Sequence, residues 1–251
     1  MNANRTSRII STIQILVSSL LTVMIITGLV LANQAGPGYA VGLLLGIFPE
    51  VALILGSFIP VLILRIKHRS QVAEGYLLPL FLLMLSLQTS RIIPSLMSFS
   101  GVAIISMTWI VILQRFFFIG TFTVLLYAAI QNMKNINTSK TGSNVAFSLI
   151  AAFVVSYIIP VNSTGIQSPF HDAIFNLLVL MIMLSAVMTY LISFVSDRES
   201  YHLKRFLTFL FISLGDFMII VGDMDLAASA IGTGLFVTGA IMLSVVSPKG
   251  Y

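Results

Sequence analysis

Four charged side chains lie inside long apolar stretches of this sequence: Glu50, Arg91, Arg115 and Asp216. A charged group at the centre of a bilayer is disfavoured by about 2.5–3.5 kcal/mol or more. Such residues therefore face the protein interior, and they mark candidate sites of ion movement, proton transfer or binding. Two acids and two bases also give a set that is neutral overall. We predict that these four residues form one buried charged cluster.

Polar neighbours and residue counting suggest how the cluster is built. Gln88 lies one helical turn from Arg91, so both share a face of the same helix. We counted the depth of each charge from the end of its helix, at a rise of about 1.5 Å per residue. Arg91 and Asp216 then lie at similar depths, as do Glu50 and Arg115, which suggests two pairs. This pairing predicts that the second, third, fourth and seventh helices surround the cluster. The alternative is a set of structural ion pairs that only fix helix register.

Small residues predict two faces for close helix packing. Gly38, Gly42 and Gly46 recur every fourth residue, so on a helix they form a groove that leads to the first of the four charges. Gly232 and Gly239 give the last apolar stretch a similar face. Faces of this kind let neighbouring backbones approach each other.

A histidine and an acid open one of the later apolar stretches. His171 and Asp172 directly precede it, on the side that we assign to the outside. Asp172 near a helix N-terminus is favourable for capping and for the helix dipole. The functional alternative is a proton-accepting entrance, because histidine titrates near neutral pH.

The composition places the whole chain in a membrane. Of 251 residues, 58% are hydrophobic and 8% charged, and the mean hydropathy is +1.05. Soluble domains average roughly 25% charged residues. Since a span needs about 20 apolar residues, we predict a single all-α transmembrane domain over residues 1–251, with no soluble domain. Its eight helices are expected near 9–32, 40–65, 76–98, 102–131, 144–161, 172–195, 206–222 and 226–247.

The basic residues predict the orientation of the chain. With the N-terminus inside, eleven of the thirteen Lys and Arg fall on the inner side, and Arg91 and Arg115 lie within spans. Cationic bias in short loops sets topology, so both termini are expected to be cytoplasmic. The expected location is a bacterial cytoplasmic membrane. If the first span were a cleaved signal peptide, seven spans would remain.

Several classes of site are absent from the sequence. It has no cysteine and three histidines, so we expect no metal site. It lacks phosphate-loop, zinc-protease and serine-hydrolase motifs, and no lysine lies within a span to form a Schiff base. The net charge of +5 is spread over short loops, which argues against binding of nucleic acid. We expect no cofactor.

The sequence favours a multi-pass membrane protein that binds or translocates a small solute, ion or proton. Glu50 and Asp216 would accept cations or protons, with Arg91 and Arg115 as their partners or as anchors for anions. The expected partners are membrane lipids and this small solute or ion. The residues favour a function other than catalysis. An intramembrane lipid-processing enzyme and a non-catalytic sensor or assembly subunit are the alternatives.

Overall fold

The chain forms helices throughout the part that the structure describes. The computed structural model describes the backbone of residues 3–35, 37–66, 76–94, 97, 105–133, 141–160, 173–221 and 225–245. No strand occurs in these ranges. The prediction of an all-α fold is confirmed for them, because long apolar runs can satisfy their backbone hydrogen bonds within one segment only as helices.

Eight α-helices and one short 3-10 turn are described. Their bounds are α1 Ala3–Ala35, α2 Pro37–Ile66, α3 Leu77–Gln88, η1 Thr89–Arg91, α5 Met107–Gln131, α6 Thr141–Ile158, α7 Ala173–Asp197, α8 Ser200–Val221 and α9 Leu226–Val245. Pro49 and Pro60 lie inside α2. Each removes one intrahelical donor from a helix that is otherwise uninterrupted.

Among the described residues, six segments are long and apolar enough to cross a membrane: Thr6–Leu31, Leu77–Pro94, Met107–Gln131, Thr141–Ile158, Ala173–Asp197 and Leu226–Val245. A shorter apolar segment, Ile47–Ile63, lies in α2. Helices of this length and composition are those of a membrane protein.

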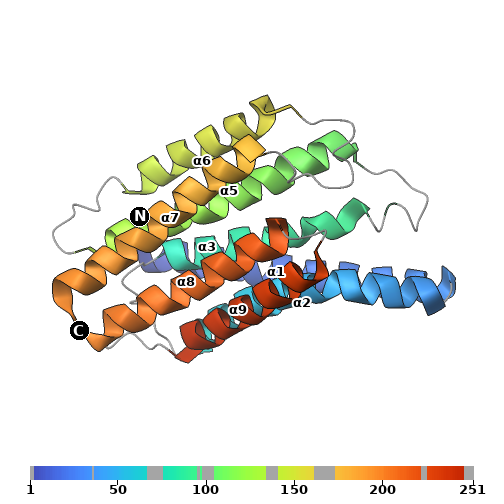
Figure 1. Ribbon diagram of the computed structural model, residues 1–251, viewed down its shortest axis with the longest axis horizontal. Coiled ribbons are helices and arrows are strands. Elements are labelled where there is room, and N and C mark those ends of the chain that lie inside the picture. Colours follow the sequence, from blue (N-terminus) through green and yellow to red (C-terminus); the bar gives the residue numbers. More distant parts are fainter. Residues whose placement is uncertain are drawn as a thin grey trace.

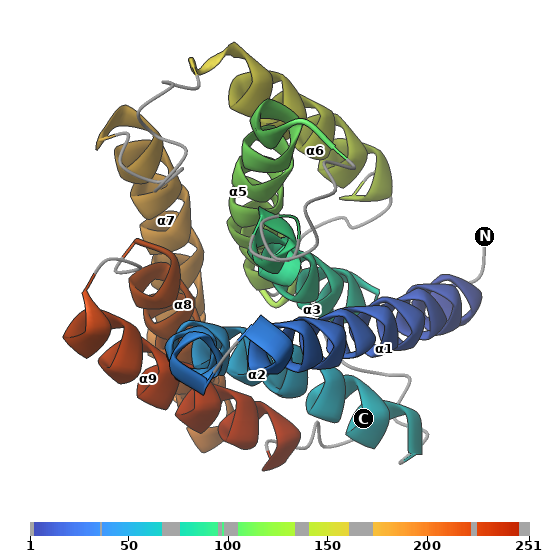
Figure 2. The ribbon, with the colours of Figure 1, turned by 90° about the vertical axis from the view of Figure 1, so that its right-hand side faces the viewer.

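The helices run alternately in opposite directions along the long axis of the molecule (Figure 1). Six of them form a ring in which α3 packs against α5, α5 against α7, α7 against α8, α8 against α9, α9 against α2, and α2 against α3. Outside this ring, α1 packs against α2 and α3, and α6 packs against α5; Figure 2 shows this arrangement along the helices. Most of α5 is buried, so it belongs to the core of the bundle.

Helices α1 and α7 carry apolar faces that the bundle leaves uncovered. On α1 the exposed apolar side chains recur every three or four residues: Ile9, Ile13, Leu16, Leu20, Val23, Ile26 and Val30. On α7 a similar stripe consists of Ile174, Leu177, Met181, Leu184, Met188, Ile192 and Val195. Continuous apolar stripes of this length are suited to contact with lipid chains.

The junction of α7 and α8 differs from the sequence prediction, which assigned about ten residues from Ser196 onward to an inner loop. The structure leaves only Arg198 and Glu199 between the two helices, and α8 begins at Ser200. Charged residues such as Lys204 and Arg205 are good helix formers, so a helix can extend beyond its apolar segment. Hydropathy marks where the apolar segment ends, and the helix continues past that point.

Replacing Arg198 by glycine is expected to stabilise this junction by about 0.5–1 kcal/mol. Arg198 has a φ of 48°, the left-handed conformation, and its N–H donates to the Phe194 carbonyl at 2.7 Å. Glycine adopts this conformation at a helix C-terminus without steric cost. Thermal unfolding of the purified protein would measure the gain.

Glu199→Gly is the matched control, because it introduces the same residue one position later. It should not raise the melting temperature, since glycine there only adds freedom to the unfolded chain. Equal melting temperatures for the two variants would contradict this account of Arg198.

Candidate functional site

Three helices of the ring meet at a buried polar node formed by Gln88, Thr121 and Asp216. Gln88 Nε2 on α3 donates to Thr121 Oγ1 on α5 at 2.7 Å and to Asp216 Oδ2 on α8 at 3.3 Å. Thr121 Oγ1 in turn donates to the Phe117 carbonyl at 2.8 Å. Asp216 and Thr121 have no exposed surface, and Gln88 is 2% exposed. One amide thus links α3, α5 and α8 through a carboxylate and a hydroxyl.

Local sequence explains why Gln88 is the last residue of α3. Thr89 Oγ1 donates to the Ser86 carbonyl at 2.6 Å, and the tighter turn η1 follows directly. Pro94 cannot donate an N–H to the Ser90 carbonyl, which weakens the helix just beyond this turn. Interruption of a helix by a 3-10 turn often marks a hinge. The node therefore lies where the regular hydrogen bonding of α3 changes.

Aromatic side chains pack against one another on the helices that carry the node. Phe118 on α5 lies with its ring centre 6.1 Å from that of Phe217 and 5.4 Å from that of Phe122. Towards the start of α8, Phe209 stacks on Tyr190 at 4.5 Å and meets Phe81 edge-on at 6.0 Å. These packed rings make the interior of the bundle largely apolar on the helices that carry the node.

Two buried polar atoms near this level make no hydrogen bond to the described residues. They are Gln88 Oε1 and Ser213 Oγ. Ser213 lies one turn before Asp216 on α8, so both side chains belong to the same face of that helix. Buried polar atoms in this state are uncommon, and they provide acceptors that a proton or ligand could use.

Glu50 is also buried, at 3% exposure, on α2 next to the buried Pro49. α2, the helix that carries Glu50, packs against α1, α3, η1 and α9. Its pairing with Arg115 stays a prediction. α3 packs against both α2 and α5, the helices that carry the two side chains.

Arg115 contacts α7 and the two residues that directly follow α6. It is 4% exposed, and its Nη1 donates to the Ile159 carbonyl at 3.0 Å and to the Pro160 carbonyl at 3.4 Å. Its guanidinium carbon lies 5.3 Å from the ring centre of Phe175, within range of a cation–π interaction. In this way a cation on α5 satisfies carbonyls at the end of α6.

Several predicted residues fall where the structure gives no side-chain surroundings. The backbone of Arg91 belongs to η1, and its side chain lies outside the described residues, so the pairing with Asp216 stays a prediction. His171 and Asp172 are outside the described residues altogether. Gly38, Gly42 and Gly46 lie in α2, and their environment is likewise not described.

Glycines bring α8 and α9 into direct backbone contact. A Cβ at Gly232 would lie 2.9 Å from the Gly215 carbonyl oxygen and 2.9 Å from the Ile219 nitrogen. A Cβ at Gly239 would lie 2.8 Å from the Ile212 nitrogen. Sequence reasoning selected Gly232 and Gly239 and missed Gly215, which faces Gly232, because α8 carries no second glycine to form a repeat. A lone glycine within a helix rich in large apolar residues was the available signal.

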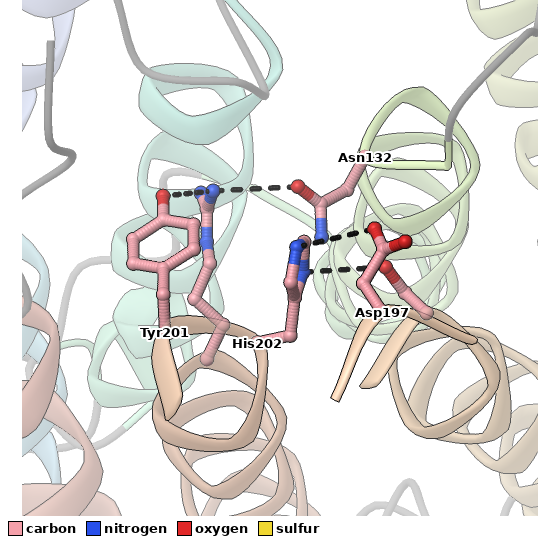
Figure 3. A network of polar contacts seen from close by, with 6 residues as sticks. Asn132, Asp197, Tyr201 and His202 are labelled. Atoms are coloured by element: carbon pink, nitrogen blue, oxygen red, sulfur yellow. Dashed lines mark hydrogen bonds and ion pairs between the residues drawn. The ribbon is translucent and has the colours of Figure 1, made fainter. Parts of the chain in front are cut away.

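A second polar network lies where the end of α5 meets the junction of α7 and α8, and sequence analysis did not single it out (Figure 3). Arg205 Nη1 donates to the Tyr201 hydroxyl and to Asn132 Oδ1. His202 Nε2 lies 3.5 Å from Asp197 Oδ2, and its Nδ1 lies 3.4 Å from Ser193 Oγ. The spacing of four residues between Tyr201 and Arg205 was a signal for part of it.

The contacts from Ser193 to His202 and from His202 to Asp197 join the same residue types as the catalytic triad of serine hydrolases. Both distances exceed the 2.6–3.2 Å that such proton transfers use. Ser193 also lies within α7, where the backbone N–H groups already serve the helix and cannot stabilise an oxyanion. These contacts therefore join α7 to α8, and we assign them no catalytic function.

Comparison with known proteins adds no assignment to this geometry. Within the described ranges, no three His, Asp or Glu side chains gather as metal ligands. Neither the protein-family models, nor the curated proteins, nor the solved structures contain a match to this chain.

Proposed function

We propose that this chain is an eight-span protein of a bacterial cytoplasmic membrane, with both termini cytoplasmic, that binds and moves a small ion or solute through the node at Asp216. One observation carries the proposal: a carboxylate with no exposed surface accepts a hydrogen bond from Gln88 at the meeting point of three helices. Ionisable residues in this position are costly in a membrane and are functional candidates by default.

Three further features support this proposal: the helix break beside the node, other buried charges on neighbouring helices, and apolar stripes that face outward. The node adjoins the change from α3 to η1, which would allow the end of α3 to move. Glu50 on α2 and Arg115 on α5 supply further buried charge on the helices that pack against α3. Exposed apolar stripes on α1 and α7 favour lipids as the surrounding partners.

Asp216→Asn should abolish ion movement in reconstituted vesicles. Proton flux would be followed with an enclosed pH-sensitive dye, and Na⁺ and K⁺ flux with ion-selective dyes, each against vesicles without protein. Asparagine keeps the size of the side chain and removes its charge, so the expected rate is that of the empty vesicles. Wild-type flux of all three ions through Asp216→Asn would overturn the proposal.

The matched control is Asp225→Asn, which makes the same chemical change on the surface. Asp225 is exposed, and its Oδ1 accepts a hydrogen bond from the Ala227 N–H at 2.9 Å at the start of α9. Asparagine is an equally good capping residue. This variant should therefore fold and should retain the wild-type flux.

A further inference from the structure

We infer that the Asp216 site binds a proton rather than a metal ion, and that Gln88 couples its protonation to the junction of α3 and η1. The inference deepens the proposed function and depends on it only for the movement of the proton across the membrane.

The packing around the carboxylate favours the smallest ligand. Hard cations such as Ca²⁺ and Mg²⁺ take about six or more oxygen ligands. Here an N–H donor, Gln88 Nε2, approaches Asp216 Oδ2 at 3.3 Å, and a donor repels a cation from that oxygen. Thr121 and Phe118 beside the node have no exposed surface. A proton needs no coordination shell, so it can bind without displacing these side chains.

Both protonation states of the carboxyl group find partners at this level. The ionised group accepts from Gln88 Nε2, as the structure records. A proton taken from water onto Asp216 turns the group into a donor, which then needs an acceptor. Gln88 Oε1 and Ser213 Oγ are buried acceptors that make no hydrogen bond to any described residue, and Gln88 already contacts the carboxyl group through Nε2.

Rotation of the Gln88 amide would carry the change to two helices. For Oε1 to accept from protonated Asp216, Nε2 must turn away from both Asp216 and Thr121. The 2.7 Å bond to Thr121 on α5 would then break. Because Gln88 is the last residue of α3, the same rotation acts on the turn Thr89–Arg91. Protonation would therefore change how the end of α3 is held between α5 and α8.

Few other ionisable groups on the packed helices could give the same response. Neither α9 nor α3 carries one between its bounds. On α5 the charged group is Arg115, two turns from Thr121 and bonded to carbonyls after α6. α7 contributes Tyr190, stacked on Phe209, and Asp197 at its inner end. Arg91 belongs to η1, and Glu50 lies on α2, which packs against η1.

Infrared spectroscopy during a pH titration of the purified protein tests the inference directly. Wild-type protein should show a pH-dependent C=O stretch of a buried carboxylic acid that Asp216→Asn removes and Asp225→Asn retains. Gln88→Met keeps the carboxyl group and deletes the amide, so the band should persist and shift to higher frequency. This third variant tests the site even if Asp216→Asn fails to fold.

Two outcomes would overturn the inference. In the first, no pH-dependent carboxylic acid band both disappears in Asp216→Asn and shifts in Gln88→Met. The other is an Asp216 carboxylate band that shifts on addition of Na⁺ or K⁺ at constant pH, which would identify a metal ion as the ligand. The flux assay separates this inference from the proposed function. If Asp216 titrates but Asp216→Asn leaves flux unchanged, only the proposal of transport is contradicted. If Asp216→Asn abolishes flux but the carboxylic acid band is missing, only the proposal of proton binding is contradicted.

Discussion

Gly232→Val is expected to lower the free energy of unfolding by about 3 kcal/mol or more, or to prevent folding. A Cβ at this position would lie 2.8 Å from Met218 Cβ, in addition to its contacts with the backbone of Gly215 and Ile219. Flexible side chains can move away from an added atom, but helix backbones can separate only as whole helices. The loss would be measured by unfolding in mixed detergent micelles.

Gly234→Val is the matched control on the same helix. Gly234 is exposed, and nothing lies within 4 Å of a Cβ added there. The same substitution should therefore change the free energy of unfolding by no more than about 0.5 kcal/mol. Similar losses from the two variants would show that the contact of α8 with α9 is not the close packing described above.

The helical architecture follows from the sequence because its physical cause is local. Each of the eight apolar windows overlaps one described α-helix, since a run of about 20 apolar residues in lipid must satisfy its own backbone. The ends of α8 could not be obtained in this way. Its first residues, from Ser200 to Arg205, are polar but helical, and hydropathy gives no information on where such a helix begins.

The contacts of the polar node could not be predicted from the depth of each residue, counted from the end of its helix. Thr121 lies about 21 Å along α5 from Met107, whereas Asp216 lies about 8 Å from the end of α8. Both nevertheless bond to the same amide of Gln88. Counting assumes that all helices begin at one level, and α5 and α8 do not. Depth alone is therefore a poor guide to which intramembrane charges pair.

The choice of Gln88 and Asp216 from sequence did not depend on helix ends: Asp216 was chosen as a charge within an apolar helix, and Gln88 because it shares a helix face with the charged Arg91. A charge within an apolar helix is costly in a membrane unless it has a partner, and a polar side chain on the same face as such a charge is a candidate for the same site. Thr121 escaped notice because threonine can bond to its own helix, as it does here to Phe117, and so gives no sign of a partner elsewhere.

Arg115→Met is expected to lower the free energy of unfolding by about 2–3 kcal/mol. Methionine fills a similar volume, but it leaves the Ile159 and Pro160 carbonyls without the donor they now share and removes the cation from Phe175. Charged hydrogen bonds in a buried setting contribute more than neutral ones. The measurement is again unfolding in mixed micelles, where α6 should separate from α5 most readily.

Two further variants show whether this loss belongs to the carbonyl contacts or to the removal of any positive charge. Arg8→Met deletes a charge from an exposed position on α1 and should leave the free energy of unfolding within about 0.5 kcal/mol of the wild type. Arg115→Lys should be intermediate, because an ammonium group can bond to one carbonyl but lacks the planar fork that also stacks on Phe175. If lysine restores wild-type stability, charge alone accounts for Arg115; if methionine costs no more than it does at Arg8, the contacts with Ile159 and Pro160 do not stabilise the bundle.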